Sequence, residues 1–186
     1  MPKYINTKGE LKKCLEIELK GYSCGFLNYF PIFISKCQAI RKIIYNLRHY
    51  EYHLNSKHKV RTLFYKIKTG YWENRTCVRI PPNVIDIGLS IGHVGPIIIN
   101  EFCVIGKNFR VHVGVNIGAG ADNAPGKCPR LGNNIYVGPG AKIFGNIDIA
   151  DNCKVGANAV VNKSCYKCVA TLVGVPAVQV NRSTTT

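Results

Sequence analysis

One side chain in the segment SIGHVG, residues 90–95, is suited to acid–base chemistry. His93 stands among glycine and aliphatic residues. An imidazole titrates near neutral pH, so it can take a proton from a hydroxyl group and hand it on. The same side chain could also ligate a metal or pack as a polar residue in a wall. The surrounding pattern has to decide between these roles.

The composition argues against a metal site. From residue 77 onward the chain holds only two histidines, His93 and His112. A zinc site built from histidine ligands in this part of the chain would need three. The nine cysteines include one CxxC pair, Cys165 and Cys168, without a second pair or a nearby histidine. We therefore expect no metal and read the cysteines as reduced thiols. With a polar N-terminal segment and no secretion signal, this predicts a cytoplasmic protein.

The first part of the chain carries helical signals. Thr7 and Glu10 form a capping box, followed by leucines every fourth residue from Leu11. A second amphipathic run follows Ser35, and a third covers roughly residues 60–67. The segment KTGYWENRT, residues 68–76, is expected to break the helices. We predict a helical N-terminal domain over residues 1–76.

The second part has a period of six. Ten aliphatic residues recur at this spacing, with one interruption: Ile99, Ile105, Val111, Ile117, Leu131, Val137, Ile143, Ile149, Val155 and Val161. Each hexapeptide makes a short strand and a turn, so stacked coils bury a ladder of aliphatic side chains. We predict a mainly β domain built as a parallel β-solenoid over residues 77–180, then a disordered tail over 181–186. The interruption after Ile117, rich in glycine and proline, predicts an excursion that carries substrate contacts.

The chain has a net charge of +15, with 15 Lys or Arg against 5 Asp or Glu in residues 1–76. Such an excess attracts anions in general. The charges alternate with apolar residues, so no nucleic acid partner is predicted. The apolar stretch over residues 24–34 contains Pro31 and is too short to span a bilayer. It is interpreted as a buried segment between helices, with peripheral membrane contact as the alternative.

Several motifs resemble those of the hexapeptide-repeat acyltransferases, in particular the serine acetyltransferases. They are IPPNVIDIGLSIGHVGPIIIN, VHVGVNIGAG, LGNNIYVGPGAKIFGNIDIADNCKVGANAVVNK and VGVPA, spread over about residues 80–178. Within this family, the resemblance is expected to be to the short bacterial forms that are associated with surface or capsular polysaccharide clusters. The resemblance implies a left-handed parallel β-helix, a homotrimer or higher homo-oligomer, and active sites in clefts between neighbouring subunits.

The resemblance also implies roles for single residues. His93 matches the catalytic histidine and would act as general base, taking the proton of an acceptor hydroxyl as it attacks acetyl-CoA. It lies six residues before Ile99, so we expect it to occupy a wall position of the ladder. His112 would line the acceptor pocket or have a structural role. Two positions depart from the family: Val78 stands where a carboxylate orients the histidine, with Asp86 as a possible substitute, and Cys128 stands where a second histidine is usual.

The remaining implied contacts concern the acceptor and the cofactor. Lys127 falls where the family has an arginine, and with Cys128 it belongs to the loop that grips the acceptor. The residues implied to contact acetyl-CoA are Gly138, Pro139, Ala157, Asn162 and Lys163. Gly138, Pro139 and Ala157 are small residues that leave room for the pantetheine arm on successive coils. Asn162 and Lys163 suit the phosphates of CoA.

Three functions follow from this pattern. The first is acetyl transfer from acetyl-CoA to the hydroxyl of L-serine, a step of cysteine biosynthesis. The second keeps the chemistry and replaces serine with a sugar hydroxyl of a surface or capsular polysaccharide, which the changes at Val78 and Cys128 favour. The third is a β-helix scaffold without catalysis.

Overall fold

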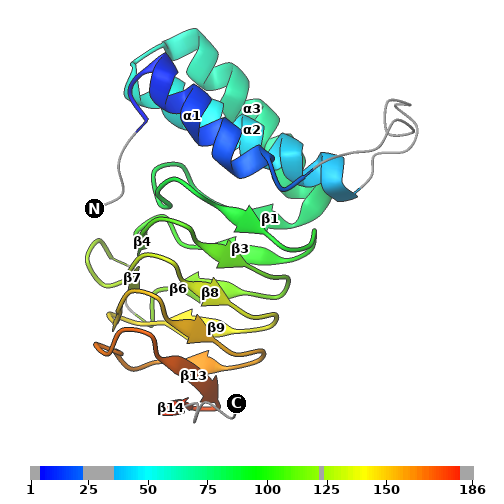
Figure 1. Cartoon of the computed structure of the whole chain (residues 1–186). Helices are drawn as coiled ribbons and strands as arrows, with labels where there is room; N and C mark the ends of the chain where they lie inside the picture. The colour runs from blue at the N-terminus through cyan, green and yellow to red at the C-terminus, as the bar shows by residue number, and fades with distance from the viewer. Residues whose placement is uncertain (1–4, 23–35, 122–123, 181–186) are drawn as a thin grey trace.

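The computed structural model describes residues 5–22, 36–121 and 124–180, and it places three helices on one end of a stack of parallel strands (Figure 1). The helices are α1 (Lys8–Leu19), α2 (Lys36–Asn55) and α3 (Lys59–Thr76). The expected inter-helix segment at 24–34 and the expected disordered tail lie outside the described residues. None of the helices in the described ranges carries an apolar stretch long enough to cross a membrane.

The first two helices form where the sequence predicts them. The Thr7 hydroxyl accepts from the Glu10 N–H at 3.2 Å, and the Glu10 carboxylate accepts from the Thr7 N–H at 3.1 Å. This capping box supplies partners for the backbone groups that the start of α1 leaves open. In α2 the predicted apolar face is buried and joins the main core: Ala39, Ile40, Ile43, Ile44 and Leu47.

The expected break at residues 68–76 is wrong. Helix α3 continues through Gly70 and ends at Thr76, where Cys77 adopts a left-handed conformation and its N–H donates to the Glu73 carbonyl at 2.8 Å. The reason is tertiary: Thr69, Trp72 and Thr76 are the buried residues of α3. Burying a tryptophan offsets the weak helix propensity of glycine and threonine.

The strands are short and form three sheets, here named A, B and C. Sheet A contains β1 (Val78–Arg79), β3 (Ile97–Ile99), β6 (Asn116–Gly118), β9 (Lys142–Phe144) and β12 (Val160–Val161); sheet B contains β4 (Val104–Ile105), β7 (Arg130–Leu131) and β10 (Asp148–Ile149). Sheet C contains β2 (Ser90–Ile91), β5 (Arg110–Val111), β8 (Tyr136–Val137), β11 (Lys154–Val155), β13 (Thr171–Gly174) and β14 (Ala177–Val180). All pairings are parallel except that of β13 with β14.

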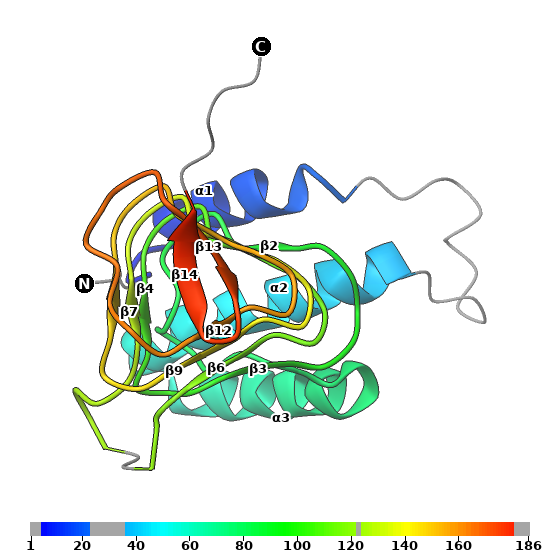
Figure 2. The same cartoon turned by 90° about the horizontal axis from the view of Figure 1, so that it is seen from below.

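Successive strands pass from sheet C to A to B and back to C, so each coil contributes to all three sheets. Seen along the stack, the coils form a triangle (Figure 2). We name its corners by the sheets they join, in chain order: the C–A corner, the A–B corner and the B–C corner. Val137 pairs with Val155 and Ile143 with Val161, which is three hexapeptides per coil.

The aliphatic ladder predicted from the period of six is confirmed. All ten residues lie in the core with 0–4% of their surface exposed. Burying one such side chain contributes roughly 1.5–3 kcal/mol, so the ladder is the main source of stability in the coils. At the B–C corner Asn108, Asn134 and Asn152 all have positive φ, and their side-chain amides bond one another at 2.8 and 2.9 Å. Mainly parallel β structure with N-terminal helices is thus confirmed.

A buried ionic cluster joins the helices to the first coil. Arg48 of α2 bonds both carboxylate oxygens of Glu18 at 2.7 and 3.0 Å and the carboxylate of Glu51 at 2.7 Å. It also donates to the backbone carbonyls of Ile85 and Asp86, each at 2.9 Å. These five bonds use all the N–H donors of a guanidinium.

The carboxylates of this cluster also hold backbone groups. Glu18 accepts from the N–H groups of Gly88 and Leu89 at 2.9 and 2.8 Å. Burial disfavours the charge of Arg48, but Glu51 and Glu18 outweigh it and hold the pKa of the guanidinium well above its ordinary value. The guanidinium therefore stays charged, and the buried carboxylates of Glu18 and Glu51 depend on this cation to balance their charge.

Replacing Arg48 with methionine should leave two buried carboxylates without their cation. We expect the free energy of unfolding, measured by urea denaturation, to fall by about 3–5 kcal/mol. The matched control is Arg130→Met, which removes the ion pair of Arg130 with Asp148, both about two-fifths exposed. That change should cost no more than about 1 kcal/mol. Equal losses in the two variants would contradict the assigned role of Arg48.

Candidate functional site

His93 lies at the C–A corner of the first complete coil, and its side chain is exposed. Ile91 pairs with Val111 and Ile99 pairs with Ile117. The chain advances eight residues from Ile91 to Ile99 but only six from Val111 to Ile117, so this corner carries two extra residues. The expectation that His93 fills a wall position of the ladder is wrong. The insertion moves the imidazole out of the wall and into solvent.

His112 lies on the next coil and packs against the same corner. A side-chain carbon on Gly92 would fall 2.5 Å from Nδ1 of His112, so this ring occupies space that only glycine leaves open. The ring centres of His93 and His112 are 6.3 Å apart, and that of Tyr136 is 5.2 Å from that of His112. Glycine at position 92 thus allows two imidazoles to lie close together.

The environment keeps His112 neutral. Burial, then the charges of Arg110 and His93, lower the pKa of His112 below its ordinary value. Its Nε2 is buried and, in the described part of the chain, has no hydrogen-bond partner. The structure thus places His112 beside His93, a position that fits both roles expected from the sequence, a pocket residue or a structural one.

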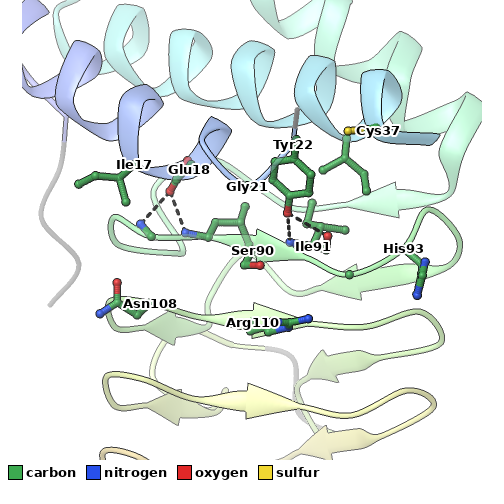
Figure 3. Close-up of a pocket in the computed structure, with 14 residues that line it drawn as sticks. Ile17, Glu18, Gly21, Tyr22, Cys37, Ser90, Ile91, His93, Asn108 and Arg110 are labelled. Atoms are coloured by element: carbon green, nitrogen blue, oxygen red, sulfur yellow. Dashed lines mark hydrogen bonds between the residues drawn. The ribbon is translucent and has the colours of Figure 1, made fainter. Parts of the chain in front are cut away.

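A cavity of about 500 Å³ opens between the helices and sheet C, with His93 at one end (Figure 3). Its polar lining includes Tyr22, Ser90, Asn108 and Arg110. The Tyr22 hydroxyl donates to the Ile91 carbonyl at 2.9 Å and accepts from the Ile91 N–H at 2.6 Å. The side chain that follows α1 therefore holds the strand leading to His93.

Neither position considered for an orienting carboxylate lies beside His93. Val78 is buried in sheet A, opposite Ile97. Asp86 lies at the B–C corner, where its carboxylate accepts from the Ile87 N–H at 2.7 Å. The suggestion that Asp86 replaces the missing carboxylate is therefore not supported, because it stands at another corner of the same coil.

Three of the predicted cofactor residues line up below the histidines. Val111, Val137 and Val155 are paired in register, so Gly138, Pro139 and Ala157 lie at the same C–A corner on the following coils. Pro139 and Ala157 are exposed. A side-chain carbon on Gly138 would meet the Ala157 nitrogen at 2.8 Å. The coils therefore pack closely here and leave an outer surface of small residues.

The other predicted residues lie at the A–B corner. Asn162 and Lys163 follow β12, and Lys127 lies in the excursion between β6 and β7; all three are exposed. Cys128 is buried, with its sulfur 3.4 Å from Oδ1 of Asn100 and its thiol pKa raised by burial. The expectation that Cys128 contacts a substrate is wrong, because its side chain faces the interior of the coil.

Sequence reasoning missed Tyr22, Glu18 and Arg110 as parts of this region. Arg110 had a usable signal, since it precedes the ladder residue Val111 and must point outward from sheet C. Tyr22 and Glu18 had none, because their partners lie about 70 residues further along the chain.

The chain is similar to known serine acetyltransferases. It is 38% identical over 88 residues to the serine acetyltransferase of Staphylococcus aureus (strain Mu50), which covers 47% of this chain and 41% of that relative. The fold matches that of Neisseria gonorrhoeae serine acetyltransferase in complex with serine, at 25% identity and a TM-score of 0.66, covering 94% of this chain and 70% of that one. It also matches a serine acetyltransferase in complex with CoA, at 23% identity and a TM-score of 0.65, covering 93% and 71%.

No protein-family model matches the chain. The chain matches less than half the length of its curated relative in S. aureus. The similarity in sequence is therefore confined to about half of the chain, while the similarity in fold extends over nearly all of it. These likenesses confirm the resemblance that the repeat and its motifs indicated: the chain is similar to the serine acetyltransferases.

Proposed function

We propose that this protein is an acetyl-CoA-dependent O-acetyltransferase, with L-serine as the first candidate acceptor. The observation that carries the proposal is the exposed His93, set by a two-residue insertion at the corner whose next coils present Pro139 and Ala157. The relatives named above support it, since one is bound to serine and one to CoA. We further propose a left-handed coil, a helical domain over 1–76 and a coil domain over 77–180, and a cytoplasmic location.

In this proposal His93 is the general base. Its imidazole takes the proton from the acceptor hydroxyl as that oxygen attacks the thioester carbon of acetyl-CoA. The tetrahedral intermediate then collapses, the carbon–sulfur bond breaks, and the proton passes from His93 to the departing thiolate. The products are an acetyl ester and free CoA. Burial lowers the pKa of His112, which favours its neutral form, so the positive charge that develops at the corner during the reaction falls on His93.

Acetyl-CoA would lie along the C–A corner below His93. Exposed Pro139 and Ala157 offer a shallow surface to the pantetheine arm, where bulk would block it. Asn162 and Lys163 suit the phosphates, but they stand at the A–B corner. In a homotrimer the A–B corner of one copy can face the C–A corner of the next, which would complete the site from two chains.

A sugar hydroxyl is the second candidate acceptor. Cys128 stands in the loop that grips the amino acid acceptor in the family, and Val78 stands where a carboxylate orients the histidine. Both side chains face the interior, so two positions that serve a serine site in the family are withdrawn from the surface. The cavity beside His93 is about 500 Å³, which is ample for a sugar ring. This candidate fits the short bacterial branch associated with polysaccharide clusters.

His93→Ala should lower acetyl transfer by at least about 100-fold, because a general base contributes that much or more. The measurement is release of free CoA thiol from acetyl-CoA in the presence of an acceptor. His58→Ala, a change at an exposed histidine before α3, is the matched control and should keep wild-type activity. Thiol release that is the same in His93→Ala and wild type would overturn the general-base role.

The acceptor can be decided in the same assay. With L-serine as acceptor, kcat/KM should exceed that with any of a panel of free sugars by more than about tenfold. The reverse order would establish the second candidate. Acceptor-independent thiol release, unchanged by His93→Ala, would contradict both and favour the scaffold.

Ala157→Trp should raise the KM for acetyl-CoA by about tenfold or more, because an indole would fill the proposed pantetheine surface. The KM for the acceptor should change little. Lys107→Trp, which places the same bulk on an exposed position of the B–C corner, is the control. Equal KM values for acetyl-CoA in both variants would contradict the placement of the cofactor.

A further inference from the structure

The regular repeat is broken a further time, at the B–C corner of the last coil. Ile149 of β10 bridges Cys165, and Val155 pairs with Leu172. The chain advances six residues from Ile149 to Val155 but seven from Cys165 to Leu172, so this corner carries one extra residue. The insertion lies in the segment CYKCV, residues 165–169, which contains the one CxxC motif of the chain. The proposed acetyl transfer gives no role to this break.

Val169 ends the segment in a backbone conformation that valine rarely adopts. Its φ is 62°, in the left-handed region, and its N–H donates to the Asp151 carbonyl at 3.1 Å. Asn152 holds the same position one coil earlier, with a φ of 61°. Asparagine tolerates this region, whereas a β-branched side chain is strained there. Strained backbone is concentrated at functional sites, so this corner is a candidate for one.

Two sulfur atoms lie against the inner side of the corner. The sulfurs of Cys153 and Cys165 lie 3.4 and 3.7 Å from the Lys167 carbonyl oxygen, to which both thiols donate. This carbonyl is bonded to the nitrogen of Cys168, so the Cys165 sulfur lies against the peptide that leads into Cys168. Cys153 and Cys165 are buried, whereas Cys168 is exposed. The corner therefore places an exposed thiol next to a buried thiol of the same CxxC motif.

The arrangement favours thiol–disulfide chemistry over metal binding. In the described ranges no group of three or more His, Cys, Asp or Glu side chains is placed to hold a metal ion. Burial raises the pKa of the Cys153 thiol, and Cys165 and Cys168 add to this effect. Cys153 therefore stays protonated and is a poor nucleophile. Cys165 and Cys168 remain as the pair that can react with each other.

The corner is open to solvent in the proposed homotrimer as well. The contact between copies uses the C–A and A–B corners, which bound sheet A, and the B–C corner lies opposite that sheet (Figure 2). Tyr166 and Val169, on either side of the insertion, are 77% and 76% exposed. A small oxidant or a small thiol can therefore reach Cys168 in a single copy and in the trimer.

We propose that Cys165 and Cys168 form a reversible disulfide, which makes the B–C corner of the last coil a redox-modification site. Hydrogen peroxide oxidises the Cys168 thiol to a sulfenic acid and is reduced to water. The Cys165 sulfur then attacks the Cys168 sulfur, the sulfur–oxygen bond breaks, and the hydroxyl leaves as water with the Cys165 proton. The pair has lost two electrons and two protons, which two molecules of a small thiol return. The proposal does not depend on the acetyltransferase function.

Tryptic digestion after oxidation tests the proposal on the full chain. Trypsin cleaves between the two cysteines, after Lys167, so they fall in separate peptides, 164–167 and 168–182. Protein treated with hydrogen peroxide, and then unfolded with its free thiols blocked, should yield these two peptides joined. Incubation of the oxidised protein with glutathione before blocking should separate them. Mass spectrometry detects both results.

Two variants and a matched control sharpen the test. Cys168→Ser should lose the joined peptides, and because this side chain is exposed, the circular dichroism spectrum should match that of wild type. Cys165→Ala should leave Cys168 as a single thiol, which forms a mixed disulfide when glutathione is present during oxidation. Cys77→Ser, a change at an exposed cysteine that follows α3, is the control and should give the joined peptides in the wild-type amount.

Three results would overturn the proposal. One is a link from peptide 164–167 to peptide 143–154, which carries Cys153 in place of Cys168. Another is the absence of joined peptides, with Cys168 either unreacted or oxidised further to a sulfinic acid. The third is a disulfide between two copies of the chain, which would appear as a dimer on a non-reducing gel.

Discussion

The structure depends on one charged group, the guanidinium of Arg48, in a place from which water is excluded. Each of its five N–H donors has an acceptor, and these acceptors come from α1, α2 and the first coil. A buried cation is tolerated only when it is paired and fully hydrogen-bonded. The helices therefore have one position on the coils in which the charges balance. That position sets the cavity beside His93, because Glu18 also holds the backbone at Gly88 and Leu89.

The coils follow from the sequence because their geometry repeats. A period of six with aliphatic residues predicts the buried ladder and the stacking of parallel coils, and the asparagines at the B–C corner supply the left-handed backbone that tight corners require. The same reasoning locates Pro139 and Ala157 on one edge. It works because each coil rests on the one before it, so local spacing and long-range position are equivalent.

Where the repeat is broken, spacing alone misleads. His93 is in phase with the ladder by count, yet two added residues place it outside the wall, and this displacement is what makes it available for chemistry. The end of α3 and the partners of Arg48 were also beyond the sequence, since each is decided by packing between segments far apart along the chain. The sequence also gives no orienting partner for His93, since neither Val78 nor Asp86 is placed to act as one.

In the proposed homotrimer the site is shared between copies of the chain, because its proposed residues stand at two corners on either side of sheet A. Subunit mixing tests this directly. His93→Ala and Lys163→Glu, carrying different tags, are co-expressed, and assemblies holding both tags are assayed below the KM for acetyl-CoA. If neighbouring copies complete each site, about a third of the sites in a mixed trimer regain both wild-type residues, and activity rises well above that of either variant alone. Mixed assemblies no more active than their parents would contradict the shared site.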